Sequence, residues 1–155
     1  MLDEISLKIL KILQKKARIP NVEVARQVGM APSAVLERIR KLEKKGFIDG
    51  YEVRLNPEKF KRNLVAFISV VTSARESVPL TAKRLSIIPE IQEVHHITGQ
   101  DGFLVKVRVS DVMELEKLIQ NKILKIAAVN TTHTAIAMST FKETARIPID
   151  TNDID

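Results

Sequence analysis

The basic side chains of residues 38–45 are the group whose types and spacing most clearly suggest a chemistry, which is the binding of a polyanion. Arg38, Arg40, Lys41, Lys44 and Lys45 follow one another within the stretch "APSAVLERIRKLEKKG". Lysine and arginine attract phosphate by charge, and arginine can also donate two hydrogen bonds to one base edge. A charge run is equally typical of a solvated helix face, so this stretch alone leaves both interpretations open.

The distribution of charge along the chain favours the polyanion interpretation. Residues 1–62 hold 15 Lys and Arg against 8 Asp and Glu, a net charge of +7. Residues 63–155 hold 10 Lys and Arg against 11 Asp and Glu, so the excess of the whole chain, +6, lies entirely in the first part. A basic module joined to a nearly neutral one indicates that one part meets phosphate and the other has a different task.

Few side chains suggest catalysis or metal binding. The chain has no cysteine, which excludes disulfides, thiol catalysis and zinc–cysteine sites. His95 and His96 adjoin in a predicted strand and would point to opposite faces, while His133 is remote in sequence, so we expect no metal site. With no glycine-rich phosphate loop and no convincing Ser–His–Asp set, we expect neither enzymatic activity nor a cofactor.

The remaining bulk properties indicate a globular chain with no association with membranes. Its 155 residues suit one domain or two small ones, and an apolar content of 45% allows a real core. No apolar run approaches the ~20 residues that span a bilayer. The start, "MLDEISLKIL", is acidic where a signal peptide would be basic, so we expect a cytoplasmic location, with the chromosome.

The elements that must position the basic residues are three predicted helices in the first 45 residues. Asp3 can cap the first helix, whose apolar residues recur at three- to four-residue spacing. Gly29 ends the short second helix, and Pro32 begins a third that extends over about residues 32–45. Two short helices joined by a tight glycine-containing turn are typical of a helix-turn-helix.

The third helix has an apolar face and an opposite polar face. Its inner residues are Val35, Leu36, Ile39 and Leu42. Its N-terminal half would then enter the major groove, where the side chains placed to reach base edges are Ser33, Ala34, Glu37 and Arg38. The residues expected to contact phosphates are Arg40, Lys41, Lys44 and Lys45. Asn21 and Ala31, at the starts of the second and third helices, complete the expected DNA-binding set.

The stretch after the third helix predicts a wing and then a linker. "FIDGYEVRL" alternates around an Asp49–Gly50 turn signal and predicts a small β-hairpin. The polar "NPEKFKRN" predicts a linker. The expected domains are therefore a DNA-binding domain over 1–56, a linker over 57–63, a second domain over 64–145 and a flexible tail over 146–155.

The second domain alternates between strand and helix patterns. Strands are predicted at residues 63–72, on both sides of "GQDG" and in "AVNTTHTAIAMST", and helices at 79–88 and 111–123. The order β-α-β-β-α-β is the ferredoxin-like split, so the fold class is α+β with a winged helix-turn-helix in front. Apolar residues on both sides of strand 64–72 indicate that helices cover one sheet face and that a second copy's sheet covers the other, giving a homodimer.

Two polar clusters in the second domain could bind a small molecule. "TGQDG" taken alone is a hairpin turn, and "NTTHT" taken alone is a strand with solvent-facing threonines. Together they offer backbone N–H groups, hydroxyls and one carboxylate. That set could hold both the α-carboxylate and the α-ammonium of an amino acid.

The sequence resembles a known family. The residues follow the pattern "D..IL..L" and then "R....E.A..VG...S.V..RI..LE..G.I.GY....N", with matches dispersed from Arg18 to Gly50. This pattern resembles the Lrp/AsnC (feast/famine) family of transcription regulators. The resemblance extends to about residue 145, and the second domain is similar to that family's effector domain.

The resemblance implies both assembly and a ligand. It implies dimers formed through the sheets, which commonly assemble further, often to octamers, and amino-acid effector sites between dimers. Carried onto this sequence, the implied effector residues are Gly99, Gln100, Asp101, Gly102, Thr132, His133 and Thr134. Two positions depart from the family pattern. Ala31 stands where the family usually has serine, and Gly102 stands where its acid usually falls, with Asp101 one position earlier.

We therefore expect a sequence-specific, DNA-binding transcription regulator whose DNA binding or assembly is modulated by a small effector, expected to be an amino acid. One alternative is an architectural DNA-binding protein with no effector, which would share the basic front but show little sequence preference. Another is a ferredoxin-like domain that regulates an amino-acid enzyme. The net charge of +7 and the helix-turn-helix pattern argue against the second alternative.

Overall fold

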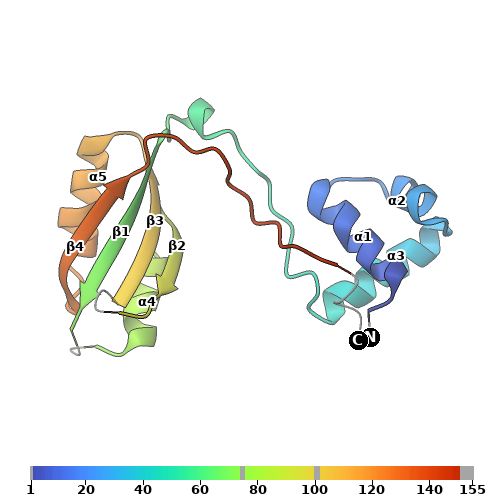
Figure 1. The fold of residues 1–155 in the computed structure, drawn as a ribbon, viewed down its shortest axis with the longest axis horizontal. Helices are drawn as coiled ribbons and strands as arrows, with labels where there is room; N and C mark the ends of the chain where they lie inside the picture. Colours follow the sequence, from blue (N-terminus) through green and yellow to red (C-terminus); the bar gives the residue numbers. More distant parts are fainter. Residues whose placement is uncertain (1, 74–75, 100–101, 151–155) are drawn as a thin grey trace. The chain divides into compact units, whose positions relative to one another are not determined.

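The computed structural model describes residues 2–73, 76–99 and 102–150, which form two compact units (Figure 1). Unit 1 comprises Met1–Arg54 with Glu143–Asp155, and unit 2 comprises Leu55–Lys142. The N-terminal unit is helical, and the second unit is built on a sheet. This arrangement confirms the predicted α+β class, with a helical unit followed by a βαββαβ unit.

Unit 1 packs three helices around one apolar core. The helices are α1 (Glu4–Lys15), α2 (Asn21–Val28) and α3 (Pro32–Lys44). The Asp3 carboxylate caps α1 by accepting a hydrogen bond from the Ser6 N–H at 2.8 Å. Gly29 ends α2 in the left-handed conformation, with φ of 72°, and Pro32 begins α3 as expected. The buried core residues are Ile9, Leu10, Leu13, Val24, Ala25, Val35, Ile39 and Leu42.

The predicted β-hairpin after α3 is not formed. Residues 47–56, all of them described, contain no strand. The apolar side chains that would have faced a hairpin partner, Tyr51, Val53 and Leu55, are exposed instead. An isolated two-stranded hairpin is marginally stable in water, and these side chains find no apolar surface to cover. The Tyr51 hydroxyl donates a hydrogen bond to Glu43 at 2.8 Å.

The chain beyond residue 145 was expected as a flexible tail, and part of it contacts α1. The Gln14 side-chain amide donates to the Ile147 carbonyl at 3.1 Å and accepts from the Ile147 N–H at 2.9 Å. The Arg146 guanidinium donates to the Lys15 carbonyl at 3.3 Å, and Ile149 packs against the helical core. Residues 151–155 of the expected tail lie outside the described residues.

Unit 2 contains a four-stranded antiparallel sheet in the order β2-β3-β1-β4. The strands are β1 (Leu64–Thr72), β2 (Ile91–His96), β3 (Gly102–Val109) and β4 (Val129–Ile136). The helical elements are η1 (Pro57–Phe60), α4 (Val78–Ser86), α5 (Val112–Leu118) and the π-helical turn η2 (Ile119–Ile123). The chain order confirms the predicted ferredoxin-like split.

The two faces of the sheet differ in burial. Alternate residues of β1, namely Ala66, Ile68 and Val70, are fully buried beneath α4 and α5 together with apolar residues of β3. On the other face, which we call the open face, Phe67 remains 40% exposed. The expectation that both faces of β1 are buried is therefore met on the helix side, whereas on the open face Val65 is buried and Phe67 is not.

Gly102, the first residue of β3, is required by its backbone conformation. Its φ is 88°, and a Cβ added there would lie 2.5 Å from Thr72 Oγ1. We expect Gly102→Ala to lower the free energy of unfolding of unit 2 by about 1 to 2 kcal/mol. Calorimetric or circular-dichroism melting measures this loss.

Gly50→Ala is the matched control for that prediction. A Cβ at Gly50 would meet no atom within 4 Å. The melting temperature of the Gly50→Ala variant should therefore equal that of the parent or be slightly higher. Equal stability of the two variants would show that the left-handed backbone at Gly102 is not a constraint.

Candidate nucleic-acid interface and effector region

The orientation of α3 is set by the residues that it buries. Val35, Ile39 and Leu42 are at most 6% exposed and pack in the core of unit 1. The opposite side of the helix is left to solvent. The exposed predicted DNA-binding residues of α3 and its C-cap are Ser33, Glu37, Arg40, Lys41, Lys44 and Lys45, and Ala34 and Arg38 are half-buried.

The starts of α2 and α3 lack side-chain caps. Ala31 is the N-cap residue of α3 and offers no side-chain hydrogen bond, as its residue type requires. Asn21, predicted as a DNA contact, is the first residue of α2 and is half-buried, with Pro20 at the N-cap. The uncapped N–H groups in the first turn of α3 therefore remain able to bind an anion.

Arg38 is held within unit 1 and does not project freely from α3. Its guanidinium NH1 donates to Asp3 Oδ2 at 2.6 Å and to Ser6 Oγ at 3.2 Å. The hydrogen bonds from Ser6, followed by the one from Arg38, lower the pKa of Asp3 to about 2. Sequence reasoning missed Asp3 and Ser6 as partners of the recognition helix, because the only local signal at Asp3 was its capping role.

The other charged residues of α3 divide into a pair and a free group. Glu37 and Lys41 form an exposed ion pair one turn apart, with Lys41 Nζ 2.7 Å from Glu37 Oε1. The hydrogen bond from Lys41 lowers the pKa of Glu37. The side chains of Arg40, Lys44 and Lys45 make no hydrogen bond or ion pair to any other described residue. These three cations are the ones most readily available to phosphate.

Of the described effector candidates, Gly102 and Thr132 lie near one end of the sheet of unit 2, and Thr134 lies nearer its middle. Gly102 of β3 and Thr131 of β4 both pair with Val71 of β1, so the loop before β3 and the first part of β4 lie at the same end. The Ile97 N–H donates to the Gly102 carbonyl at 2.9 Å and closes the hairpin that contains Gly99. Gln100 and Asp101, also predicted to bind the effector, lie outside the described residues.

The β4 residues of the predicted set are divided between two sheet faces. Thr132 and Thr134 pair with Val70 and Ile68 and lie on the helix side. His133 pairs with Ser69 and lies on the open face. Thr132 is half-buried, and Thr134 and His133 are exposed. Within one chain, a single small ligand could contact the threonines or the histidine but not all three.

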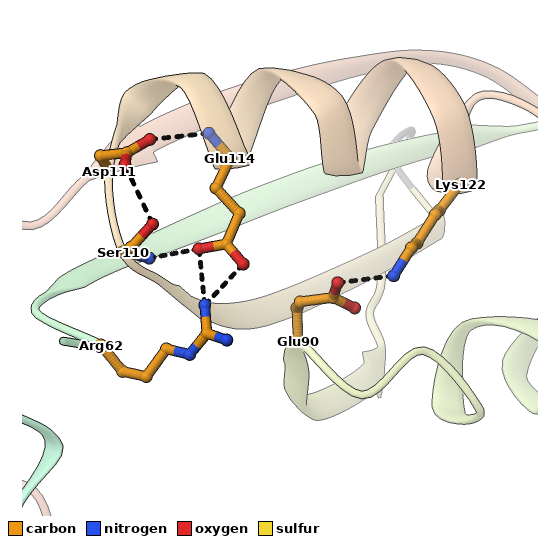
Figure 2. A network of polar contacts seen from close by, with 6 residues as sticks. All are labelled: Arg62, Glu90, Ser110, Asp111, Glu114 and Lys122. Atoms are coloured by element: carbon orange, nitrogen blue, oxygen red, sulfur yellow. Dashed lines mark hydrogen bonds and ion pairs between the residues drawn. The ribbon is translucent and has the colours of Figure 1, made fainter. Parts of the chain in front are cut away.

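A polar network anchors the chain just before β1 (Figure 2). The Arg62 NH1 group donates to both carboxylate oxygens of Glu114, at 2.5 and 2.7 Å. Glu114 Oε2 also accepts from the Ser110 N–H at 2.6 Å, and Asp111 caps α5 by accepting from the Glu114 N–H at 2.8 Å. The network therefore joins the end of the predicted linker to the first turn of α5.

The structure adds two observations about function classes. Among the described residues, no group of three or more His, Asp or Glu side chains is placed to hold a metal ion. Within the same residues, no helix has both the length and the apolar character needed to cross a membrane.

Comparison with known families gives a match for each unit. Residues 2–49 match a family described as winged helix-turn-helix DNA-binding, and residues 65–147 match the Lrp/AsnC ligand binding domain. The chain is 37% identical over 152 residues to the leucine-responsive regulatory protein of Escherichia coli K12. That alignment covers 97% of this chain and 93% of the relative.

Solved structures with similar folds agree with these matches. A transcriptional regulator of Neisseria meningitidis, solved as a complex with L-Met, has a TM-score of 0.90 and 27% identity, and the match covers 96% of this chain and 97% of that one. The leucine response regulatory protein of Mycobacterium tuberculosis has a TM-score of 0.80 and 31% identity, covering 95% and 100%.

The Arg62–Glu114 network predicts a specific dependence of stability on pH. The hydrogen bonds from Ser110 and then from Arg62 lower the pKa of Glu114 to about 2. A carboxylate with a lowered pKa stabilises the folded state above its unfolded pKa of about 4.3, and the stabilisation is lost as the pH falls toward 2. We expect Glu114→Gln to be less stable than the parent at pH 7, and the difference to shrink between about pH 4.5 and 2.

Urea unfolding at a series of pH values measures this difference. Glu116→Gln, at an exposed position two residues along the same helix, is the control and should show a much smaller change. A Glu114→Gln difference that stays constant down to pH 2 would contradict the role given to the ionised carboxylate.

Proposed function

The chain belongs to the Lrp/AsnC family of transcription regulators, and we propose that it binds specific DNA sequences through α3 under the control of an amino acid. Members of this family are regulators and not enzymes. The observation that carries the proposal is the two-sided α3, whose buried Val35, Ile39 and Leu42 leave the opposite, basic side to solvent. Such a helix can enter the major groove while its inner side stays packed.

In this proposal, residues in the first half of α3 contact base edges, and basic residues bind phosphate. Ser33, Ala34 and Glu37 lie in the first half of α3, on the side that would face base edges. Arg40, Lys44 and Lys45 have no partner among the described residues and supply charge that is independent of sequence. Lys41 joins them once DNA competes with its exposed ion pair to Glu37.

A pair of substitutions separates the two roles. We expect Lys44→Ala to weaken binding to all duplexes by a similar factor and to reduce the slope of log affinity against log salt by about 0.9, the value for one phosphate contact. Ser33→Ala should leave that slope unchanged. It should lower the ratio of the affinity for the selected duplex to the affinity for the scrambled duplex, because a lost base contact costs about 1–3 kcal/mol.

Fluorescence anisotropy measures both quantities. The probes are a duplex selected by the parent protein from a random library and a scrambled duplex of equal composition. If Ser33→Ala and Lys44→Ala changed the affinity ratio and the salt slope identically, the assignment of a reading half of α3 would be wrong.

For the effector, we propose an amino acid with an apolar side chain. The ligand-binding family match covers unit 2, one relative is named leucine-responsive, and another was solved with L-Met. On β4, the hydroxyls of Thr132 and Thr134 have no hydrogen-bond partner among the described residues. Each hydroxyl can accept a hydrogen bond from the α-ammonium or donate one to the α-carboxylate. Gly102 pairs with Val71 near the same end of the sheet.

Calorimetric titration with each of the twenty amino acids tests this proposal. We expect leucine, methionine or a close relative to bind at millimolar concentration or below. Thr132→Val keeps the branched shape and removes one hydroxyl, so it should weaken binding about tenfold, the effect of one hydrogen bond. Thr131→Val, on the opposite face of β4, is the control.

Two results would count against the amino-acid effector. One is the absence of any binder at millimolar concentration. The other is an equal loss of binding in Thr131→Val and Thr132→Val, which would remove the threonines of the helix-side face from the site.

We also propose a homodimer formed through the open face of the sheet, with higher assembly such as an octamer left to solution measurement. Phe67 is 40% exposed at the centre of that face. Beside it, Lys106 pairs with Glu93, Nζ to Oε1 at 3.1 Å, although only 8% of Lys106 is exposed. A large apolar side chain flanked by a satisfied ion pair suits a protein interface. A dimer would also present two copies of α3 to half-sites about 34 Å apart.

A further inference from the structure

A hollow of about 100 Å³ lies on unit 1, beside the reading side of α3. Asp3 and Ser6 line it from the start of α1, and Arg38, Lys41 and Lys45 line it from α3. The three basic residues are spaced three and four positions apart, so they follow one another along one stripe of the helix. The hollow therefore combines three cations with one carboxylate, and Leu42 and Phe47 complete its lining. Lys41 also pairs with Glu37, which lies outside the lining. The positive charge that remains suits a small anion.

Arg38 already holds an anion in this hollow, the side chain of Asp3. Its NH1 group is used by Asp3 Oδ2 and Ser6 Oγ, at 2.6 and 3.2 Å. A guanidinium has five N–H donors. The Nε and NH2 groups of Arg38 make no hydrogen bond to any other described residue. Arg38 can therefore bind a second acceptor while Asp3 keeps it in place, or exchange Asp3 for a stronger one.

We propose that this hollow seats one phosphodiester group of the DNA backbone. In this arrangement Arg38, Lys41 and Lys45 donate to the phosphate, and Arg38 does not read a base edge. Asp3 is a positioning residue that holds Arg38 in the hollow when DNA is absent, and its negative charge weakens phosphate binding there. The inference rests on the proposed DNA binding by α3 and adds to it two residues of α1.

The placement of the hollow agrees with the geometry of a recognition helix in a groove. The residues proposed to face bases lie in the first half of α3, whereas Lys41 and Lys45 lie in its last turn or at its C-cap. The backbone of a DNA strand borders the groove that the helix enters, so phosphates pass beside the helix and not in front of it. Side chains at the margin of the reading side are the ones that meet them.

Asp3→Asn is the variant that tests the proposal with the fold preserved. Asparagine caps a helix about as well as aspartate, so α1 keeps its N-terminal hydrogen bond. The lost ion pair with Arg38 is partly exposed and contributes little to stability. Melting temperature and circular dichroism of the full chain check that the fold is retained.

We expect Asp3→Asn to bind DNA about fivefold more tightly at fixed salt, the scale of one exposed charge interaction. The gain should be equal for the selected and the scrambled duplex, because phosphates carry no sequence information. The slope of log affinity against log salt should change by much less than the value of about 0.9 for one phosphate contact, because the same phosphate is already seated in the parent. In an Arg38→Gln background, the gain should fall to less than twofold.

Glu4→Gln is the matched control. It removes the same charge from the adjacent residue, which is exposed and does not line the hollow. If Glu4→Gln tightened DNA binding as much as Asp3→Asn, the effect would be one of overall charge and the phosphate seat would be wrong. A gain confined to the selected duplex would also overturn it, because Arg38 would then be a reader of bases.

Failure of the proposal can be told apart from failure of DNA binding itself. If the parent chain binds duplexes with the expected salt dependence but Asp3→Asn and Glu4→Gln are alike, only the phosphate seat is wrong. If the parent chain binds no duplex at low salt, the proposed function and the seat are both overturned.

Discussion

The burial of one side of α3 is the constraint on which the DNA-binding half of this protein depends. Val35 and Ile39 lie in the middle of a core built from α1 and α2, so the helix cannot rotate about its axis without exposing them. Exposing two such side chains would cost several kcal/mol, a large fraction of the stability of a small domain. The side of α3 that meets solvent, and that we propose meets DNA, is thus determined by apolar packing and not by the charges that it carries.

A similar constraint organises the second unit. β1 is one of the two inner strands of the sheet, with β3 on one side and β4 on the other. Its buried residues Ala66, Ile68 and Val70 determine which face the helices cover. The alternation of side chains then assigns every residue of β3 and β4 to a face. That assignment separates Thr132 and Thr134 from His133, and it leaves Phe67 on the face proposed for dimerisation.

The elements with strong local signals were predictable from sequence. α3 was expected over about 32–45 because Pro32 and Gly46 mark its limits, and the structure places it at Pro32–Lys44. The order of strands and helices in the second unit followed from a change of hydrophobic period. The hairpin at residues 47–55 was wrong because alternation favours a strand only where a partner covers the apolar side, and none does so here.

The contacts that could not be predicted join residues far apart in the chain. Asp3 shows a capping signal, but nothing near it in sequence reveals that Arg38 lies 2.6 Å away. Gln14 gives no sign that its amide holds the backbone of Ile147, more than a hundred residues later. Arg62 and Glu114 are separated in the same way. Such polar contacts depend on tertiary packing, and they alter the interpretation of the very arginine that looked most like a base reader.

Both units act together in the proposed function, in which an amino acid changes the sites that this protein occupies on DNA. The most direct measurement is genome-wide occupancy of the protein in its own cells, before and after leucine or methionine is added. We expect discrete sites that share a sequence, with occupancy that changes when the amino acid is present. Occupancy spread evenly along the chromosome and indifferent to every amino acid would contradict it and favour an architectural role.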